Sequence, residues 1–237
     1  MERVRAQSES LREQALGIIR DAITAGELAE DRIYSAAGLA KQLGMSLSPV
    51  REAMMALVTE GTVEAVPNRG FRLVTITEAD LEEIIAIRIL LAVPAARSLA
   101  EAGSDDIVGR DQGEGADASS GSTTKADAVI RLRGLAEETL AAAEAGELAE
   151  FYTHDRRFHE ALLEHGLGGR AAAISLRLRD QSRLYRHEDQ IGAIALDSAR
   201  ELPAIVDLIE EGRTDEVADL VTSNLYFFKR VPAEADG

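Results

Sequence analysis

An aspartate and a histidine stand four residues apart in the second half of the chain, at Asp155 and His159. On a helix this spacing puts both side chains on one face, where a carboxylate and an imidazole can bind the same ion or molecule. Three interpretations are open for the pair: ligands of a divalent metal ion, part of a polar pocket without metal, or a structural ion pair. The pair therefore marks a candidate site without fixing its chemistry.

A second group of polar residues offers complementary chemistry. Arg88 interrupts an otherwise apolar stretch, residues 84–91, and Arg183 and Tyr185 lie in a later segment. A guanidinium that points inward suits a carboxylate, because it can donate two parallel hydrogen bonds to it. For Arg88 a structural ion pair is the alternative. The residues expected to line a site for a small carboxylate are Arg88, Asp155, His159, Arg183 and Tyr185.

The elements of residues 1–77 have the order of a winged helix-turn-helix. Apolar residues recur at helical spacing in three segments, each followed by a glycine. The segments are residues 10–25, 35–43 and about 48–60. The four residues from Gly44 to Leu47 join the last two helices, a length typical of a helix-turn-helix. Residues 62–66 and 71–74 then alternate in polarity around the turn 67–70, which predicts a β-hairpin wing.

Residues 78–237 are predicted to form a separate all-α domain, an antiparallel bundle of six or seven helices. The expected helices are 77–100, 129–145, 148–164, 170–189, 193–212 and 214–229. Residues 103–128 are rich in Gly, Ser, Asp and Thr and have no apolar periodicity. They predict a mobile loop inside this domain. The expected fold class is mainly α.

Composition and charge exclude several classes of protein. The chain has no cysteine, so it has neither disulfides nor thiolate metal sites. No apolar run approaches the roughly 18 residues of a membrane span, and we expect a cytoplasmic protein without a membrane partner. Residues 1–77 carry 9 Lys/Arg and 10 Asp/Glu, whereas residues 78–237 carry 17 and 32. The net charge of −16 thus belongs to the second half, and the near-neutral first half remains free to contact nucleic acid.

The segment from Leu39 to Ala53, LAKQLGMSLSPVREA, resembles the winged-helix signature of the GntR family of transcription regulators. Glu60-Gly61 and the turn residues 67–70 follow at the family's spacings. The resemblance implies double-stranded DNA as the partner, with a recognition helix in the major groove and the wing in the minor groove. The implied contacts are Ser46, Ser48, Arg51, Asn68, Arg69 and Gly70.

For several of these residues a structural role is the alternative. Ser46 and Ser48 could instead cap the helix, Arg51 could pair with a nearby glutamate, and the wing could be an ordinary hairpin turn. Leu47 departs from the family, which usually has arginine there. A leucine can bond neither a phosphate nor a guanine, although it can contact a thymine methyl group.

The second half resembles the helical FCD ligand-binding domain of the FadR-type branch of this family. The resemblance rests on Ile87-Arg88, Ala95-Ala96 and the segment from Asp155 to His159. It implies a homodimeric regulator, such as a repressor, that binds a palindromic operator and a small-molecule effector. Relatives also complete a zinc or nickel site with two later histidines, which correspond to Leu202 and Asn224 here. Leucine cannot ligate a metal, so a site of Asp155, His159 and Asn224 looks incomplete, and no cofactor is expected with certainty.

Two other functions are weighed against regulation. One is a metal-dependent enzyme on the helical bundle, with Asp155 and His159 as ligands. The chain has no His-Glu-x-x-His sequence, no nucleophile elbow and no phosphate-binding loop, so we expect no enzymatic activity. The other is a protein-interaction module whose winged helix has lost DNA specificity.

Overall fold

The computed structural model describes residues 10–109, 123–185 and 191–226. The chain divides into two compact units, Met1–Ile76 and Thr77–Gly237. The division lies one residue before the expected boundary. Each unit has its own core and is described by itself.

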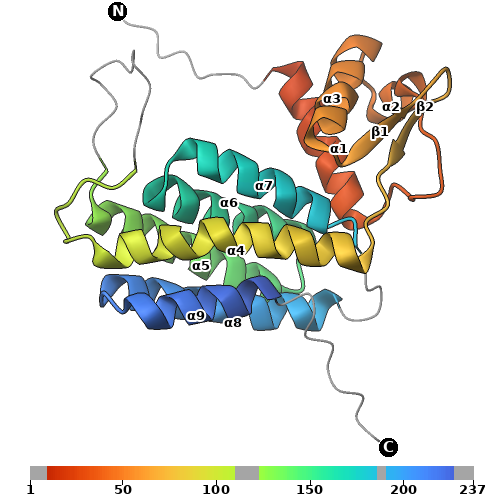
Figure 1. The fold of residues 1–237 in the computed structure, drawn as a ribbon. Helices are drawn as coiled ribbons and strands as arrows, with labels where there is room; N and C mark the ends of the chain where they lie inside the picture. The colour runs from red at the N-terminus through yellow and green to blue at the C-terminus, as the bar shows by residue number, and fades with distance from the viewer. Residues whose placement is uncertain (1–9, 110–122, 186–190, 227–237) are drawn as a thin grey trace, which may run out of the picture. The chain divides into compact units, whose positions relative to one another are not determined.

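The N-terminal unit is a winged helix-turn-helix, as predicted. Its elements are α1 (Leu11–Ala25), α2 (Ala36–Leu43), α3 (Leu47–Glu60), β1 (Val63–Val66) and β2 (Gly70–Leu73). Ser10 begins α1 with a capping box, in which its hydroxyl accepts from the Glu13 N–H and the Glu13 carboxylate accepts from the Ser10 N–H. α3 contacts α1, α2 and β1. The strands are antiparallel, with Val63 opposite Leu73 and Val66 opposite Gly70, and the resulting hairpin follows α3 in Figure 1.

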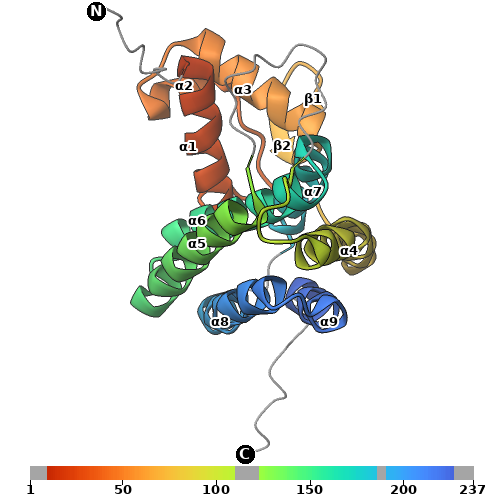
Figure 2. The ribbon, with the colours of Figure 1, turned by 90° about the vertical axis from the view of Figure 1, so that its left-hand side faces the viewer.

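The C-terminal unit is a bundle of six helices within the described residues, in agreement with the predicted fold class. The helices are α4 (Glu78–Glu101), α5 (Lys125–Ala145), α6 (Leu148–Gly166), α7 (Gly169–Ser182), α8 (Ile191–Glu210) and α9 (Thr214–Leu225). α4 contacts α6, α7 and α9, while α5 contacts α6 and α8. Figure 2 looks along the bundle and shows α8 and α9 side by side, with α4 between α7 and α9. α4, α6 and α7 therefore face a common interior.

The expected loop at 103–128 is shorter than predicted where the structure describes it. Residues 110–122 lie outside the described residues. Thr124 and Asp127 form a capping box, and α5 begins at Lys125, so residues 125–128 are helical and that part of the prediction is wrong. The last residues of the expected helices 170–189 and 214–229 fall partly outside the described residues as well. No described helix combines the length and the apolar character that crossing a bilayer requires.

Candidate functional site: a buried arginine cluster and an exposed recognition helix

Five ionisable side chains meet inside the C-terminal bundle, and we call them the arginine cluster. They are Arg88 of α4, Asp155 and His159 of α6, Arg179 of α7, and Arg183 at the C-terminal cap of α7. Asp155 and His159 are four residues apart on α6, and Arg179 and Arg183 are four apart at the end of α7. Each pair therefore shares one helix face. Arg88, Asp155 and Arg179 are each only 3% exposed. Groups of this kind are rarely so buried unless they pair or bind something.

Asp155 is the centre of the cluster. Its Oδ2 accepts hydrogen bonds from Arg179 Nη2, from Arg179 Nε at 3.2 Å and from Arg183 Nη2 at 3.2 Å. Its Oδ1 lies 3.5 Å from His159 Nε2. Burial raises the pKa of the Asp155 carboxyl, but the charge of Arg179, followed by His159 and Arg183, outweighs it and holds the pKa well below its usual value. Asp155 is therefore ionised at neutral pH.

Two of the arginines are held in fixed positions by their neighbours. Arg179 Nη2 also donates to the Tyr152 carbonyl oxygen at 3.1 Å. The Arg183 guanidinium lies over the Tyr152 ring, 4.3 Å from its centroid, in a cation–π contact. Burial and then the neighbouring Arg179 lower the pKa of Arg183 to about 10, which leaves it charged at neutral pH.

Arg88 differs from the other two arginines. Among the described residues its side chain has neither a hydrogen bond nor an ion pair, and its Nε is fully buried without a partner. Burial, followed by repulsion from Arg179, lowers the pKa of Arg88 to about 9, so it too remains a cation at neutral pH. A buried cation without a partner is costly in a protein interior. The structural ion pair weighed for Arg88 is thus not found within the described residues.

The residues expected to bind metal do not fit a divalent cation. Asp155 already accepts from two guanidiniums, and two cations beside the carboxylate oppose a third. The Asn224 amide nitrogen donates to the Ser198 carbonyl oxygen, the Ser198 hydroxyl and Glu201. Leu202 is fully buried in the apolar core. No group of three or more His, Cys, Asp or Glu side chains able to hold a metal occurs in the described ranges.

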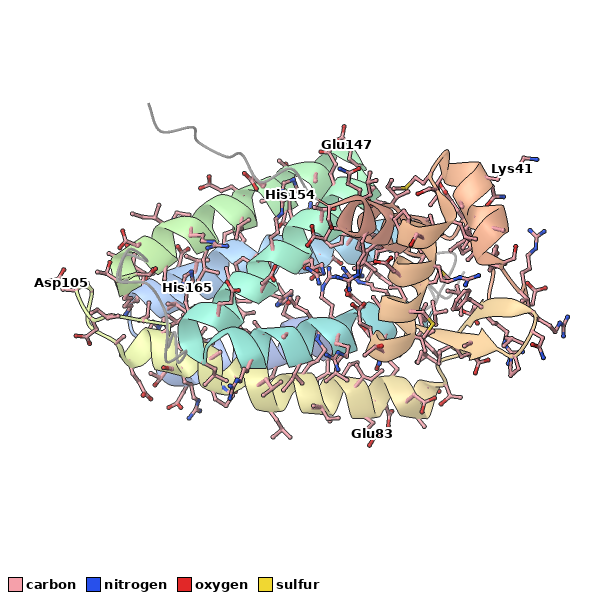
Figure 3. The ribbon with its side chains drawn as sticks, turned by 90° about the horizontal axis from the view of Figure 1, so that it is seen from above. Lys41, Glu83, Asp105, Glu147, His154 and His165 are labelled. Atoms are coloured by element: carbon pink, nitrogen blue, oxygen red, sulfur yellow. The ribbon has the colours of Figure 1, made fainter. Side chains whose placement is uncertain are left out.

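Sequence reasoning missed Arg179, the residue that holds Asp155. The one available signal was its position four residues before Arg183, which puts both on one face of α7. Tyr185 lies two residues after Arg183, and its backbone N–H donates to the Ser182 carbonyl oxygen at 3.3 Å. Two other histidines, His154 and His165, lie far apart along α6 in Figure 3 and so do not form a pair.

The start of α3 presents its side chains to solvent. Ser46 occupies the N-cap position, but its side chain makes no cap hydrogen bond, so the expected capping role is absent. The Ser48 hydroxyl donates to Glu52 Oε1 at 3.0 Å. Leu47 is 42% exposed.

Arg51, one turn further along α3, is also exposed. It forms no ion pair within the part of the chain that the structure describes. Of the nearby glutamates, Glu52 accepts a hydrogen bond from Ser48, and Glu60 is bonded to Arg20 at 2.7 and 2.6 Å. Arg51 is thus a solvated cation at the N-terminal end of a helix, where anions are favoured.

The wing carries a second exposed cation. Asn68 and Arg69 are exposed at the tip, and Asn68 has a φ of 59°. Gly70 has a structural reason to be glycine, because a Cβ there would lie 2.3 Å from the Tyr34 carbonyl oxygen. Arg72 bonds Glu64 across the hairpin, with Nε 2.7 Å from the carboxylate. Arg69 has no such partner among the described residues.

Comparison with known proteins identifies both units. Residues 11–73 match the family of bacterial regulatory proteins called gntR, and residues 119–226 match the FCD domain. The first unit therefore carries a GntR-type helix-turn-helix domain and the second an FCD domain. The predicted resemblance is thus confirmed for both halves of the chain.

Curated relatives carry the names of regulators. An uncharacterized HTH-type transcriptional regulator from the TAR-I ttuE-ttuC' intergenic region of Agrobacterium vitis is 34% identical over 125 residues, 53% of this chain and 63% of its own length. HTH-type transcriptional regulator McbR of Escherichia coli is 40% identical over 57 residues, 24% of this chain and 26% of its own length. The matches thus span less than two thirds of these relatives. Their names agree with a regulator rather than an enzyme.

Solved structures share the fold of this chain. The structure of E. coli McbR/YncC superposes with a TM-score of 0.71 at 19% identity, covering 93% of this chain and 98% of that one. The structure of Lar from Listeria monocytogenes has a TM-score of 0.54 at 15% identity, covering 95% and 100%. At these identities the likeness concerns the fold alone.

Proposed function

We propose that this protein is a sequence-specific, DNA-binding transcription regulator that binds a palindromic operator as a homodimer. The observation that carries the proposal is the exposed, unpaired Arg51 at the N-terminal end of α3, within a helix-turn-helix that matches the GntR family. Arginine at this place can donate two hydrogen bonds to a guanine edge in the major groove. A dimer is proposed because one recognition helix contacts only a few base pairs, whereas two reach the usual affinity and specificity.

The other exposed polar groups of the N-terminal unit support the same interface. Ser46 and the α3 N-terminus can hold a phosphate oxygen. Arg69, exposed at the tip of the wing, can enter a narrow minor groove, whose negative potential attracts arginine. Lys41 projects from α2 in Figure 3 and adds a further positive charge to this unit.

The proposal includes control by a small anionic effector, a carboxylate-bearing metabolite, bound at the arginine cluster. Support comes from the excess of buried guanidinium groups and from Arg88, which lacks a protein partner among the described residues. Binding of an anion there would alter the stability of the α4–α6–α7 packing, and an effector can shift operator binding only through such a difference between states. Operator release on effector binding is the behaviour of a repressor.

The test is selection of operators from a random duplex library with the purified protein, followed by titration of the enriched site. We expect a short palindrome for the wild type and for Arg97→Ala, which removes a charge from α4 instead. Arg51→Ala should weaken binding about 5- to 150-fold, the loss that corresponds to one bidentate base contact. It should also reduce the slope of log K against log salt by about one if Arg51 contacts a phosphate.

Two results would contradict the proposal. One is the absence of any enriched sequence, which would favour a protein-interaction module. The other is equal binding by Arg51→Ala and Arg97→Ala. Addition of dicarboxylates to the operator titration tests the effector separately.

A further inference from the structure

We infer that the arginine cluster binds a small dianion, with a dicarboxylate as the chemical type, directly on its guanidinium groups and without a metal ion. The inference rests on the proposed effector site and specifies its ligand class. Three features of the cluster carry the inference: its charge balance, its unpartnered donor and its fixed geometry.

The buried charges leave an excess of about two positive charges. Arg88, Arg179 and Arg183 are cations, and Asp155 neutralises one of them. His159 adds no charge at neutral pH, because burial lowers its pKa, although Asp155 opposes that shift. Asp180, at the edge of the cluster, lies 3.5 Å from Arg156 Nε and 3.8 Å from Arg179 Nη1, so it is shared with an arginine outside the cluster. A ligand with two negative charges would restore balance, whereas a divalent cation would double the excess.

The unpartnered donor is Arg88. Its Nε is buried without a hydrogen-bond partner, and the whole residue is 3% exposed. A buried N–H without an acceptor loses its hydration and gains nothing in return. An anionic oxygen is the partner that a guanidinium binds most strongly. The unsatisfied donor therefore indicates where one end of the ligand belongs.

The other arginines are positioned before any ligand arrives. Arg179 is bonded to Asp155 and to the Tyr152 carbonyl oxygen. Arg183 is bonded to Asp155 and stacked on the Tyr152 ring. Fixed donors lose little conformational entropy on binding, which favours affinity. Because Arg88 comes from α4 and Arg183 from the end of α7, a dianion that contacts both would link the two helices.

The first experiment needs no ligand. Thermal unfolding is measured in buffer with a chelator for the wild type, Arg88→Met and Arg97→Met. Both changes remove an arginine from α4, but Arg97 is half exposed and paired with Asp215 at 2.8 Å. We expect Arg88→Met to raise the unfolding midpoint by about 4 °C or more, because it removes an uncompensated buried charge. Arg97→Met should leave it nearly unchanged. A lower midpoint for Arg88→Met would overturn the inference, since Arg88 would then be a structural residue.

The second experiment adds defined anions in the same chelator. Sulfate, malonate and succinate are compared with acetate and with neutral succinamide at equal ionic strength. We expect at least one dianion to raise the wild-type midpoint while acetate and succinamide do not. Calorimetry should then show binding about tenfold or more weaker for Arg88→Met, as expected for a lost charged hydrogen bond.

Three outcomes of this second experiment would overturn the inference. They are no response to any dianion in the chelator, a response that appears only when zinc or nickel replaces the chelator, and stoichiometric binding of zinc or nickel after the chelator is removed. These readouts use no DNA. Failure of operator binding would therefore count against the proposed regulator and leave the dianion site standing.

Discussion

Replacement of Asp155 by asparagine should be among the most destabilising single changes in the C-terminal unit. The asparagine keeps the shape of the side chain but removes the negative charge that Arg179 and Arg183 bond. The side chains of Asp155 and Arg179 are each 4% exposed, so solvent screens the interaction little. Removal of one partner from a buried ion pair leaves an uncompensated buried charge and typically costs about 3–5 kcal/mol.

This loss should be visible in a simple unfolding assay. For a domain of this size about 1 kcal/mol lowers the midpoint by about 2–4 °C, so Asp155→Asn should unfold about 6–20 °C below the wild type. The matched control is Asp215→Asn, the same chemical change in a carboxylate whose side chain is 86% exposed and which pairs with Arg97. Exposed pairs contribute little, and we expect almost no shift for the control.

The pH dependence of this loss of stability provides a second test of the Asp155 interaction. The folded-state pKa of Asp155 is lowered well below its usual value, so its contribution is fully present above the unfolded-state pKa of about 3.9. It disappears as the pH falls through the folded-state pKa. The difference between wild type and Asp155→Asn should therefore be constant from about pH 8 to pH 7. Below about pH 6.5 it should grow, because the loss of Asp155 also lowers the pKa of His159 further. A loss below about 1 kcal/mol, or one no larger than that of Asp215→Asn, would refute the reasoning.

Two further predictions concern packing and DNA affinity. Gly166→Ala should destabilise the bundle by about 1–3 kcal/mol, because its Cβ would lie 2.3 Å from the Ala95 carbonyl oxygen of α4. Gly134→Ala, at an exposed helical position with nothing within 4 Å of the added Cβ, should instead stabilise the protein by about 0.5–1 kcal/mol. Chemical denaturation measures both variants. Equal effects of the two changes would contradict the packing argument. Leu47→Arg should tighten operator binding and steepen its salt dependence by about one unit of slope, as measured by titration at several salt concentrations; an unchanged slope would show that this position lies away from the phosphates.

Much of the fold was predictable because helix ends have local chemical signals. Thr77 with Asp80 at the start of α4 shows the pattern of a capping box, and the structure contains that box. Thr124 and Asp127 show the same pattern, but the surrounding Gly, Ser and Asp residues hid it, so the start of α5 was missed. The loop-like composition of this segment led to a loop prediction although the capping pattern indicated the start of a helix.

The arginine cluster was only partly predictable, for a different reason. Asp155 and His159 stood out because their spacing fixes a common face, and Arg88 stood out in an apolar stretch. Arg179 had no such mark, since α7 carries several arginines, and the one that turns inward is selected by the packing of α7 on α4 and α6. A sequence pattern gives the period of a helix but not the neighbour that covers each face. The hydrogen bonds of Asn224 with Ser198 and Glu201 likewise depend on how two helices pack, so the sequence pattern could not predict them.

In the proposed regulator, the contact between Tyr34 and the wing would limit which operators can be bound. Tyr34 and Phe71 exchange two backbone hydrogen bonds, of 2.7 and 2.9 Å, and Gly70 packs directly on the Tyr34 carbonyl. The Tyr34 hydroxyl in turn accepts from the Ala29 N–H at 2.7 Å. The hairpin is thereby tied to the segment between α1 and α2, so the wing cannot swing freely relative to the recognition helix.

In the proposed DNA complex, a wing fixed relative to α3 would make binding depend on the spacing of the bases along the duplex as well as on their identity. One extra base pair advances the next contact by about 3.4 Å and rotates it by about 35° around the DNA axis. Within each half-site, such an insertion between the bases facing α3 and those facing the wing should remove one of the two contacts rather than be absorbed. Operators of this protein should therefore tolerate base substitutions at the wing end more readily than insertions.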